Sequence, residues 1–105
     1  MPRPEDNERM WAAYLAVTQF ETDNVEHRLP CGARVDILTD EYAIEVEWCS
    51  KALQAPGQAI YYAVATARKP GVYLLLDRKP DENWLRCVIA CREANIRLWT
   101  IKTGK

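Results

Sequence analysis

Three acidic residues stand in two short stretches whose residue types favour β-strands. Asp36 lies in Arg34-Val35-Asp36, and Glu45 and Glu47 are one residue apart in the next stretch. Like charges a few ångström apart beside a sheet disfavour joint ionisation unless a cation lies between them. A divalent metal removes this conflict, and hard oxygen ligands suit Mg²⁺, for which Mn²⁺ substitutes. The spacing therefore predicts a metal site built on these acids.

A purely structural interpretation of the same acids stays open. The strict alternation of 42–48 puts both glutamates on the face away from its large apolar side chains. If that face is exposed, both glutamates are solvated, and Asp36 pairs with Arg34 or Lys51.

The elements that must position these acids are read from apolar spacing and from turn residues. A helix is expected over about 4–22, started by Asp6 or Asn7, with Glu8 beside its buried stripe. The segments 25–29 and 33–38 predict a β-hairpin, and 42–48 predicts a third strand.

The second half of the chain alternates helices with strands. A loose segment over 50–55 leads to a helix over 56–68, which Lys69-Pro70-Gly71 is expected to end. A buried strand over 72–76, a helix over 81–94 and a strand over 96–101 follow, and 102–105 is expected to be loose. The element order αβββαβαβ predicts an α/β fold in which helices flank a mixed sheet.

Composition limits the classes of protein that fit. The chain has 105 residues, 49% of them hydrophobic, which predicts a single domain over 1–105. Its net charge of −1 excludes a basic nucleic-acid coat, so any polyanion must be bound through local charge or metal ions. No apolar run approaches the ~20 residues of a membrane span. The acidic start differs from a secretory signal, so we expect a cytoplasmic protein without a membrane partner.

Four cysteines raise the question of disulfides or zinc. They have no close Cys-x-x-Cys pair, which favours reduced thiols. A zinc-stabilised interaction domain that uses His27, Cys31 and Cys49 is a further alternative.

Three short segments carry acids, an amide and a tyrosine in a fixed order: Gly32-Ala-Arg-Val-Asp36, Ala43-Ile-Glu45-Val-Glu47-Trp and Gly57-Gln-Ala-Ile-Tyr-Tyr62. In this order they resemble the PD-(D/E)xK nuclease superfamily, whose fold is restriction-endonuclease-like. The expected helix, three-strand, helix, strand order matches the core of that family, and the likeness runs from about Glu8 to Leu76. Its RecB-like branch has Gln-x-x-x-Tyr on the helix after the catalytic strand.

The resemblance assigns roles to individual acids. Asp36 resembles the first metal-binding acid of the family and Glu45 the second, with the backbone carbonyl of Val46 as a further metal ligand. Glu8 resembles the acid that many members place on the first helix. Gln58 and Tyr62 resemble the glutamine and tyrosine of the RecB-like branch, which lie beside the metal or the DNA.

One position departs from the family pattern. The usual lysine, two residues after the second acid, is replaced by Glu47. Some members use glutamate there, and in others the lysine has moved to the following helix, for which Lys51 is the candidate. The alternative is an inactive module that keeps the fold and binds nucleic acid or protein.

The resemblance implies a Mg²⁺-dependent hydrolase of phosphodiester bonds, with DNA as the expected substrate. Its catalytic residues are expected to be Asp36, Glu45, Glu47, Lys51 and Gln58. Its nucleic-acid contacts are expected from Arg28, Arg34, Lys51, Gln58 and Tyr62. A homodimer would supply two sites for two strands, and the small size suits a nuclease of a phage or mobile element.

Overall fold

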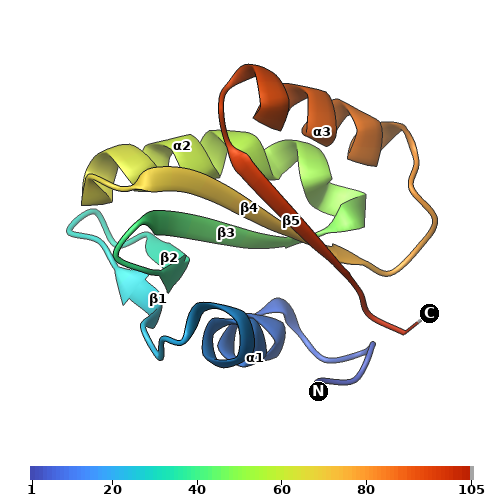
Figure 1. The fold of residues 1–105 in the computed structure, drawn as a ribbon, viewed down its shortest axis with the longest axis horizontal. Coiled ribbons are helices and arrows are strands. Elements are labelled where there is room, and N and C mark those ends of the chain that lie inside the picture. The colour runs from blue at the N-terminus through green and yellow to red at the C-terminus, as the bar shows by residue number, and fades with distance from the viewer. Residues whose placement is uncertain (105) are drawn as a thin grey trace.

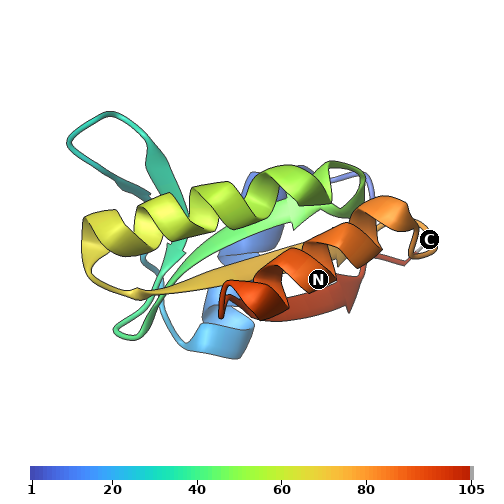
Figure 2. The ribbon, with the colours of Figure 1, turned by 90° about the horizontal axis from the view of Figure 1, so that it is seen from above.

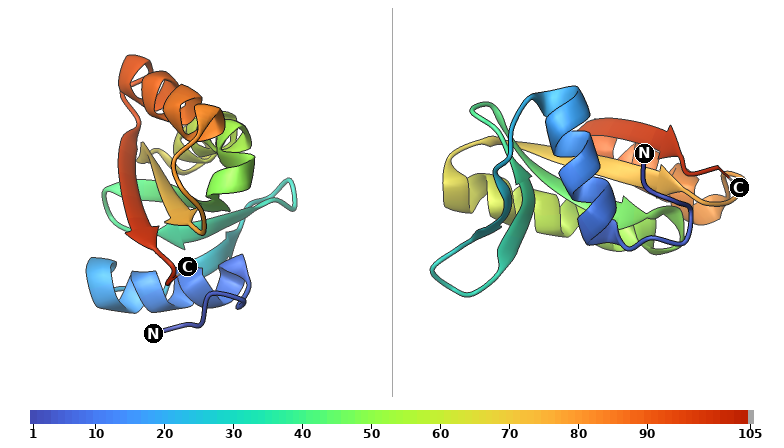
Figure 3. Two further views of the ribbon diagram at one scale, coloured as in Figure 1. Left: turned by 90° about the vertical axis from the view of Figure 1, so that its right-hand side faces the viewer. Right: turned by 90° about the horizontal axis from the view of Figure 1, so that it is seen from below.

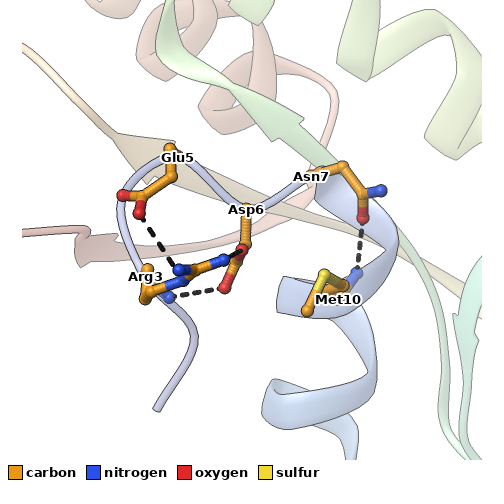
Figure 4. Close-up of polar contacts among 5 residues, drawn as sticks. All are labelled: Arg3, Glu5, Asp6, Asn7 and Met10. Atoms are coloured by element: carbon orange, nitrogen blue, oxygen red, sulfur yellow. Dashed lines mark hydrogen bonds and ion pairs between the residues drawn. The ribbon is translucent and has the colours of Figure 1, made fainter.

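The first helix begins where a side chain satisfies its free backbone amides. In the computed structural model, which describes residues 1–104, α1 spans Glu8–Phe20 (Figure 1). The Asn7 side chain accepts a hydrogen bond from the Met10 N–H at 3.0 Å, so Asn7 is the cap. Asp6 instead binds the backbone and guanidinium of Arg3 (Figure 4). These contacts fix the turn that carries Glu8.

Three antiparallel strands follow α1. They are β1 (Val25–Arg28), β2 (Arg34–Leu38) and β3 (Tyr42–Trp48), each next to its neighbour in the sheet. The turn between β1 and β2 projects beyond the helices (Figure 2). These bounds confirm the expected hairpin and third strand.

The second half adds two parallel strands with their crossover helices. The 3₁₀ helix η1 (Cys49–Gln54) leads to α2 (Ala55–Thr66), which has a proline in its first turn. Then come β4 (Lys69–Leu76), α3 (Glu82–Glu93) and β5 (Arg97–Lys102). The five-stranded sheet has the order β1-β2-β3-β4-β5, with β3, β4 and β5 parallel. The expected α/β fold with helices around a mixed sheet is confirmed.

The helices form two layers around the sheet. α1 covers one face, and α2 and α3 cover the other (Figure 3). The core beneath α1 is built from Trp11 and Leu15 together with Ile44, Val46 and Tyr73 of the sheet. A second core lies between the sheet and the other two helices, and it consists of Ala52, Ala55, Ala59, Val72, Leu74, Cys87, Cys91 and Ile96. The alternating apolar residues of β4 are thus shared between the two cores, whereas Ile44 and Val46 of β3 belong to the first core.

Two expectations for the second half are wrong. Lys69-Pro70-Gly71 belongs to β4, because pairing with β3 already begins at Tyr42 and Lys69. Pro70 is tolerated there because β5 joins β4 only from Gly71 onward. The expected loose end is also partly wrong: Lys102 lies in β5, and buried Thr103 donates its N–H to the Leu76 carbonyl at 3.2 Å. Lys105 lies outside the described residues.

Candidate active site

Asp36 and Glu45 lie beside each other where β2 and β3 part. Backbone pairing joins Ile37 to Ile44 and Leu38 to Ala43, and the same register brings Asp36 opposite Glu45. At this point the Asp36 side chain takes part in the strand contact, since its Oδ2 accepts a hydrogen bond from the Val46 N–H at 2.8 Å. The two predicted metal-binding acids are therefore brought together by adjacent strands.

Glu45 is a buried carboxyl group with an unsatisfied oxygen. It is only 5% exposed, and its Oε2 has no hydrogen-bond partner among residues 1–104. Burial raises the pKa of Glu45 to about 11, with a hydrogen bond to Asp36 and the negative charges of Asp36, Glu47 and Glu8 adding to the effect. At neutral pH this group holds a proton next to a second carboxylate. Such a site favours any cation that can replace the proton.

Glu47 and Glu8 meet at the same end of β3. Glu47 is 6% exposed, and its Oε1 accepts the Trp48 N–H at 3.0 Å. Burial, together with the negative charges of Glu47 and Asp36, raises the pKa of Glu8 to about 7. Burial also raises the pKa of Glu47. The first turn of α1 therefore adds a fourth carboxyl group to the two strands.

Lys51 supplies positive charge to this group of acids. Lys51 is exposed and lies in η1, directly after β3. Its backbone φ of −116° is not helical, so it interrupts η1. Its charge lowers the pKa of both Glu8 and Glu47, against the effect of burial. The chain thus places a lysine near the acids from the segment that follows the second strand of the site.

α2 brings one of its two predicted residues to the acids. Burial, followed by the charges of Glu45 and Asp36, raises the pKa of Tyr62 to about 12. Gln58 lies one turn earlier on the same side of α2, is exposed, and makes no side-chain hydrogen bond with residues 1–104. The tyrosine is therefore electrostatically coupled to the site, whereas the amide faces solvent.

A cleft opens beside the acids. It has a volume of about 550 Å³ and is lined by Asn7, Glu8, Arg9, Ala12, Glu26, Arg34 and Asp36. A larger depression of about 600 Å³ lies near the end of α1, but none of the four clustered acids lines it. The 550 Å³ cleft is the candidate substrate site, because Glu8 and Asp36 line it together with basic side chains.

The basic residues predicted to bind nucleic acid are placed differently from one another. Arg34 lines the cleft and pairs with Glu26, not with Asp36, so the purely structural pairing of Asp36 with Arg34 is wrong. Arg28 is exposed on β1 and does not line the cleft. Arg9 and Glu26 also line the cleft, although they were not among the residues predicted from the sequence. Arg9 follows Glu8 on α1, and this adjacency was the available signal.

The donor set suits Mg²⁺ better than zinc. Among residues 1–104, no three His, Cys, Asp or Glu side chains are grouped as a ready-made metal cage. Mg²⁺ needs no such cage, because it is usually held by one or two carboxylates together with water and substrate phosphate. The unpartnered oxygen of Glu45 next to Asp36 fits this requirement.

Among the described residues, His27, Cys31 and Cys49 do not form a group that could hold zinc. Cys49 is buried near Asp77 and Asp81, whose charges act on its thiol. Cys31 is exposed in the hairpin turn and accepts a hydrogen bond from Tyr61 at 3.0 Å. The four cysteines are free thiols, as expected from their spacing.

In the described part of the chain, no helix has the length and apolar character that a membrane crossing requires. Comparisons of the sequence with protein-family models and with curated proteins, and of the fold with solved structures, find no match.

Proposed function

We propose that the chain is a metal-dependent nuclease that hydrolyses the phosphodiester bonds of DNA, with a restriction-endonuclease-like core. The observation that carries the proposal is the buried Glu45 carboxyl beside Asp36 on the neighbouring strand, because the Oε2 of Glu45 has no partner within the described part of the chain. Placing the buried Glu45 beside the half-buried Asp36 is unfavourable for folding unless a proton or a bound cation offsets their charge. The presence of this pair beside the cleft supports a catalytic role over a structural one.

Asp36 and Glu45 are the residues that would hold Mg²⁺, with the Val46 carbonyl as a further oxygen ligand. When bound, the ion lowers the pKa of a water molecule and offsets charge on the phosphate. The hydrogen bond from the Val46 N–H of β3 holds the Asp36 carboxylate of β2 in a fixed position. This preorganisation limits the reorganisation that the site must undergo during the reaction.

Glu47 and Lys51 take the roles that the family gives to a lysine. Glu47 is held by the Trp48 N–H and accepts a proton from the attacking water. Glu8, whose pKa is raised to about 7, carries the proton of its hydrogen bond to Glu47 and thereby keeps Glu47 ionised as the acceptor. Lys51 stabilises the negative charge that develops on the phosphate oxygens.

A cleavage panel tests the proposal. Wild-type protein is incubated with labelled linear, circular, single-stranded and branched DNA, and with RNA, in Mg²⁺, Mn²⁺ or EDTA. We expect cleavage of DNA that requires the metal and is lost in Asp36→Ala and Glu45→Ala. Cleavage of RNA but not DNA would show that the substrate is RNA and contradict the proposed DNA substrate. Equal cutting by all three proteins would identify a contaminant.

The inactive-module alternative is separated by calorimetry. Titration of Mg²⁺ or Mn²⁺ into the nuclease gives a saturable heat that Glu45→Ala abolishes. A chain that keeps the fold without the activity shows neither saturable heat nor cleavage. Sedimentation of the same sample tests the proposed homodimer.

A further inference from the structure

Two arginines and one glutamate form a network at the cleft. Arg9 of α1 donates from Nε to Glu26 Oε1 at 2.8 Å, and Arg34 of β2 approaches the same oxygen with Nη1 at 3.5 Å. Glu26 itself comes from β1, so three elements meet at one carboxylate oxygen. All three residues line the cleft together with Asp36.

Glu26 lies opposite Asp36 on the neighbouring strand of the sheet and has an unusual backbone conformation. The β1–β2 pairs Val25 with Ile37 and His27 with Val35 bring Glu26 opposite Asp36. Its φ is 51°, a value that side chains other than glycine rarely adopt, least of all within a strand. Strained backbone of this kind clusters at functional sites.

Most N–H groups of Arg9 and Arg34 are not used in the contact with Glu26. Arg9 uses only its Nε and Arg34 only its Nη1 toward Glu26, whereas a guanidinium has N–H donors on all three nitrogens. The side chains of Arg9 and Arg34 are 65% and 44% exposed, so their remaining donors are accessible. Two cations and one anion give the Arg9–Glu26–Arg34 network a charge of +1, next to the acids Asp36 and Glu8 that line the same cleft. The network offsets part of the negative charge of these acids, which favours the approach of a phosphate.

We propose that Arg9 and Arg34 together bind one backbone phosphate of the nucleic acid beside Asp36, and that Glu26 is the positioning residue that holds both guanidinium groups for it. Planar guanidinium groups bind phosphate oxygens with directed, charge-assisted hydrogen bonds. The inference rests on the proposed nuclease function and adds the two residues, Arg9 and Glu26, that no motif identifies.

Binding without hydrolysis tests the arginine pair. Fluorescence anisotropy measures the affinity for a labelled DNA duplex, with single-stranded DNA and RNA of the same sequence as parallel arms. Ca²⁺ replaces Mg²⁺, and a gel verifies that the strands stay intact. We expect Arg9→Ala and Arg34→Ala each to weaken duplex binding by roughly 5-fold, and to reduce the slope of log affinity against log salt by about 0.9 per phosphate contact.

Arg86→Ala is the matched control. Arg86 is also an exposed arginine in an ion pair, with Glu82 at 3.5 Å, but it lies on α3. Its loss should change the duplex affinity by less than roughly 2-fold. If the two cleft variants bind no worse than this control while wild type cleaves DNA, the phosphate site is overturned and the nuclease proposal stands. If wild type neither binds nor cleaves any of the nucleic acids, both proposals fail.

Glu26→Gln tests the positioning role, because two models give it opposite signs. Removing a negative charge from the cleft should tighten the binding of a polyanion by electrostatics alone. If Glu26 positions the arginines, the same change weakens binding, by roughly 3-fold or more. Glu26→Asp keeps the carboxylate and tolerates positive φ, so it should bind closer to wild type. Tighter or unchanged binding by a folded Glu26→Gln protein would overturn the positioning role.

Discussion

Asp36 Oδ2 accepts a hydrogen bond from the Val46 N–H at 2.8 Å, so a side chain of β2 pairs with the backbone of β3 directly beside Glu45. The strands separate here, and the carboxylate bridges the gap. The same residue therefore serves the fold through one oxygen and the site through its charge. Substitutions that keep the acceptor but remove the charge can separate the two roles.

Asp36→Asn makes that separation. The amide oxygen can still accept the Val46 N–H, so we expect the melting temperature to stay close to that of wild type. The loss of the negative charge should lower the DNA cleavage rate by ~10²-fold or more. Asp40→Asn, at an exposed turn position between β2 and β3, is the control and should cleave normally. Retained cleavage by Asp36→Asn would exclude Asp36 from the metal site.

Glu45→Gln tests whether the buried acid is protonated when no metal is bound. With a pKa raised to about 11, Glu45 is neutral at pH 7, and glutamine has nearly the same shape. Urea unfolding should therefore give a free energy within ~1 kcal/mol of wild type. The saturable heat of Mg²⁺ binding should vanish, because an amide cannot supply the negative charge. A large gain in stability would instead mean that Glu45 is ionised in the folded protein.

The fold was largely predictable because its signals are local. The alternation over 42–48 and the caps of the helices depend on neighbouring residues, and the structure confirms both. The start of β4 was missed because Pro70 and Gly71 usually end an element. Pro70 is tolerated only because the pairing of β4 with β5 begins at Gly71. Where this pairing begins is a property of the assembled sheet and not of the local sequence.

The candidate site was predictable only in part for the same reason. Asp36 and Glu45 were identified because each lies in a recognisable strand. Arg9 and Glu26 were not, because their contact joins α1 to β1 and has no periodic pattern. The positive φ of Glu26 also has no signal in its residue type, since asparagine and glycine are the usual residues there.

Glu8 makes stability depend on pH in a direction opposite to that of most acids. Its pKa rises from 4.5 to about 7 on folding, so between these values the folded state binds more protons than the unfolded state. The free energy of unfolding should therefore fall as pH rises through this window, by roughly 1–2 kcal/mol after solvent screening. Glu8→Gln should reduce the slope measured by urea unfolding in EDTA, and the remaining slope is expected from Glu45, whose pKa is raised to about 11. A slope that Glu8→Gln leaves unchanged would assign the effect to other groups.

Lys51→Met tests the lysine that follows the second strand of the site. Its charge lowers the pKa of Glu8 and Glu47, so its loss should shift the acidic limb of the pH–rate profile to higher pH. Loss of the charge near the phosphate should also slow cleavage by roughly 10- to 100-fold. Lys51→Arg should restore part of the rate. Lys79→Met, an exposed lysine in the β4–α3 loop, should change neither quantity.

Gly71 and Gly57 give a matched pair of glycines with opposite expected effects on stability. A methyl group at Gly71 would lie 2.8 Å from Trp99 Cζ3 and 3.1 Å from Ile44 Cγ1, so the sheet and the ring must move apart. Gly71→Ala should therefore lower the free energy of unfolding by ~1–3 kcal/mol. A methyl at Gly57, within α2, meets nothing within 4 Å. Gly57→Ala should raise stability by up to ~1 kcal/mol, because alanine favours helix. Urea unfolding of both variants measures the difference, and a destabilised Gly57→Ala with an unchanged Gly71→Ala would contradict the packing of Trp99 against β4.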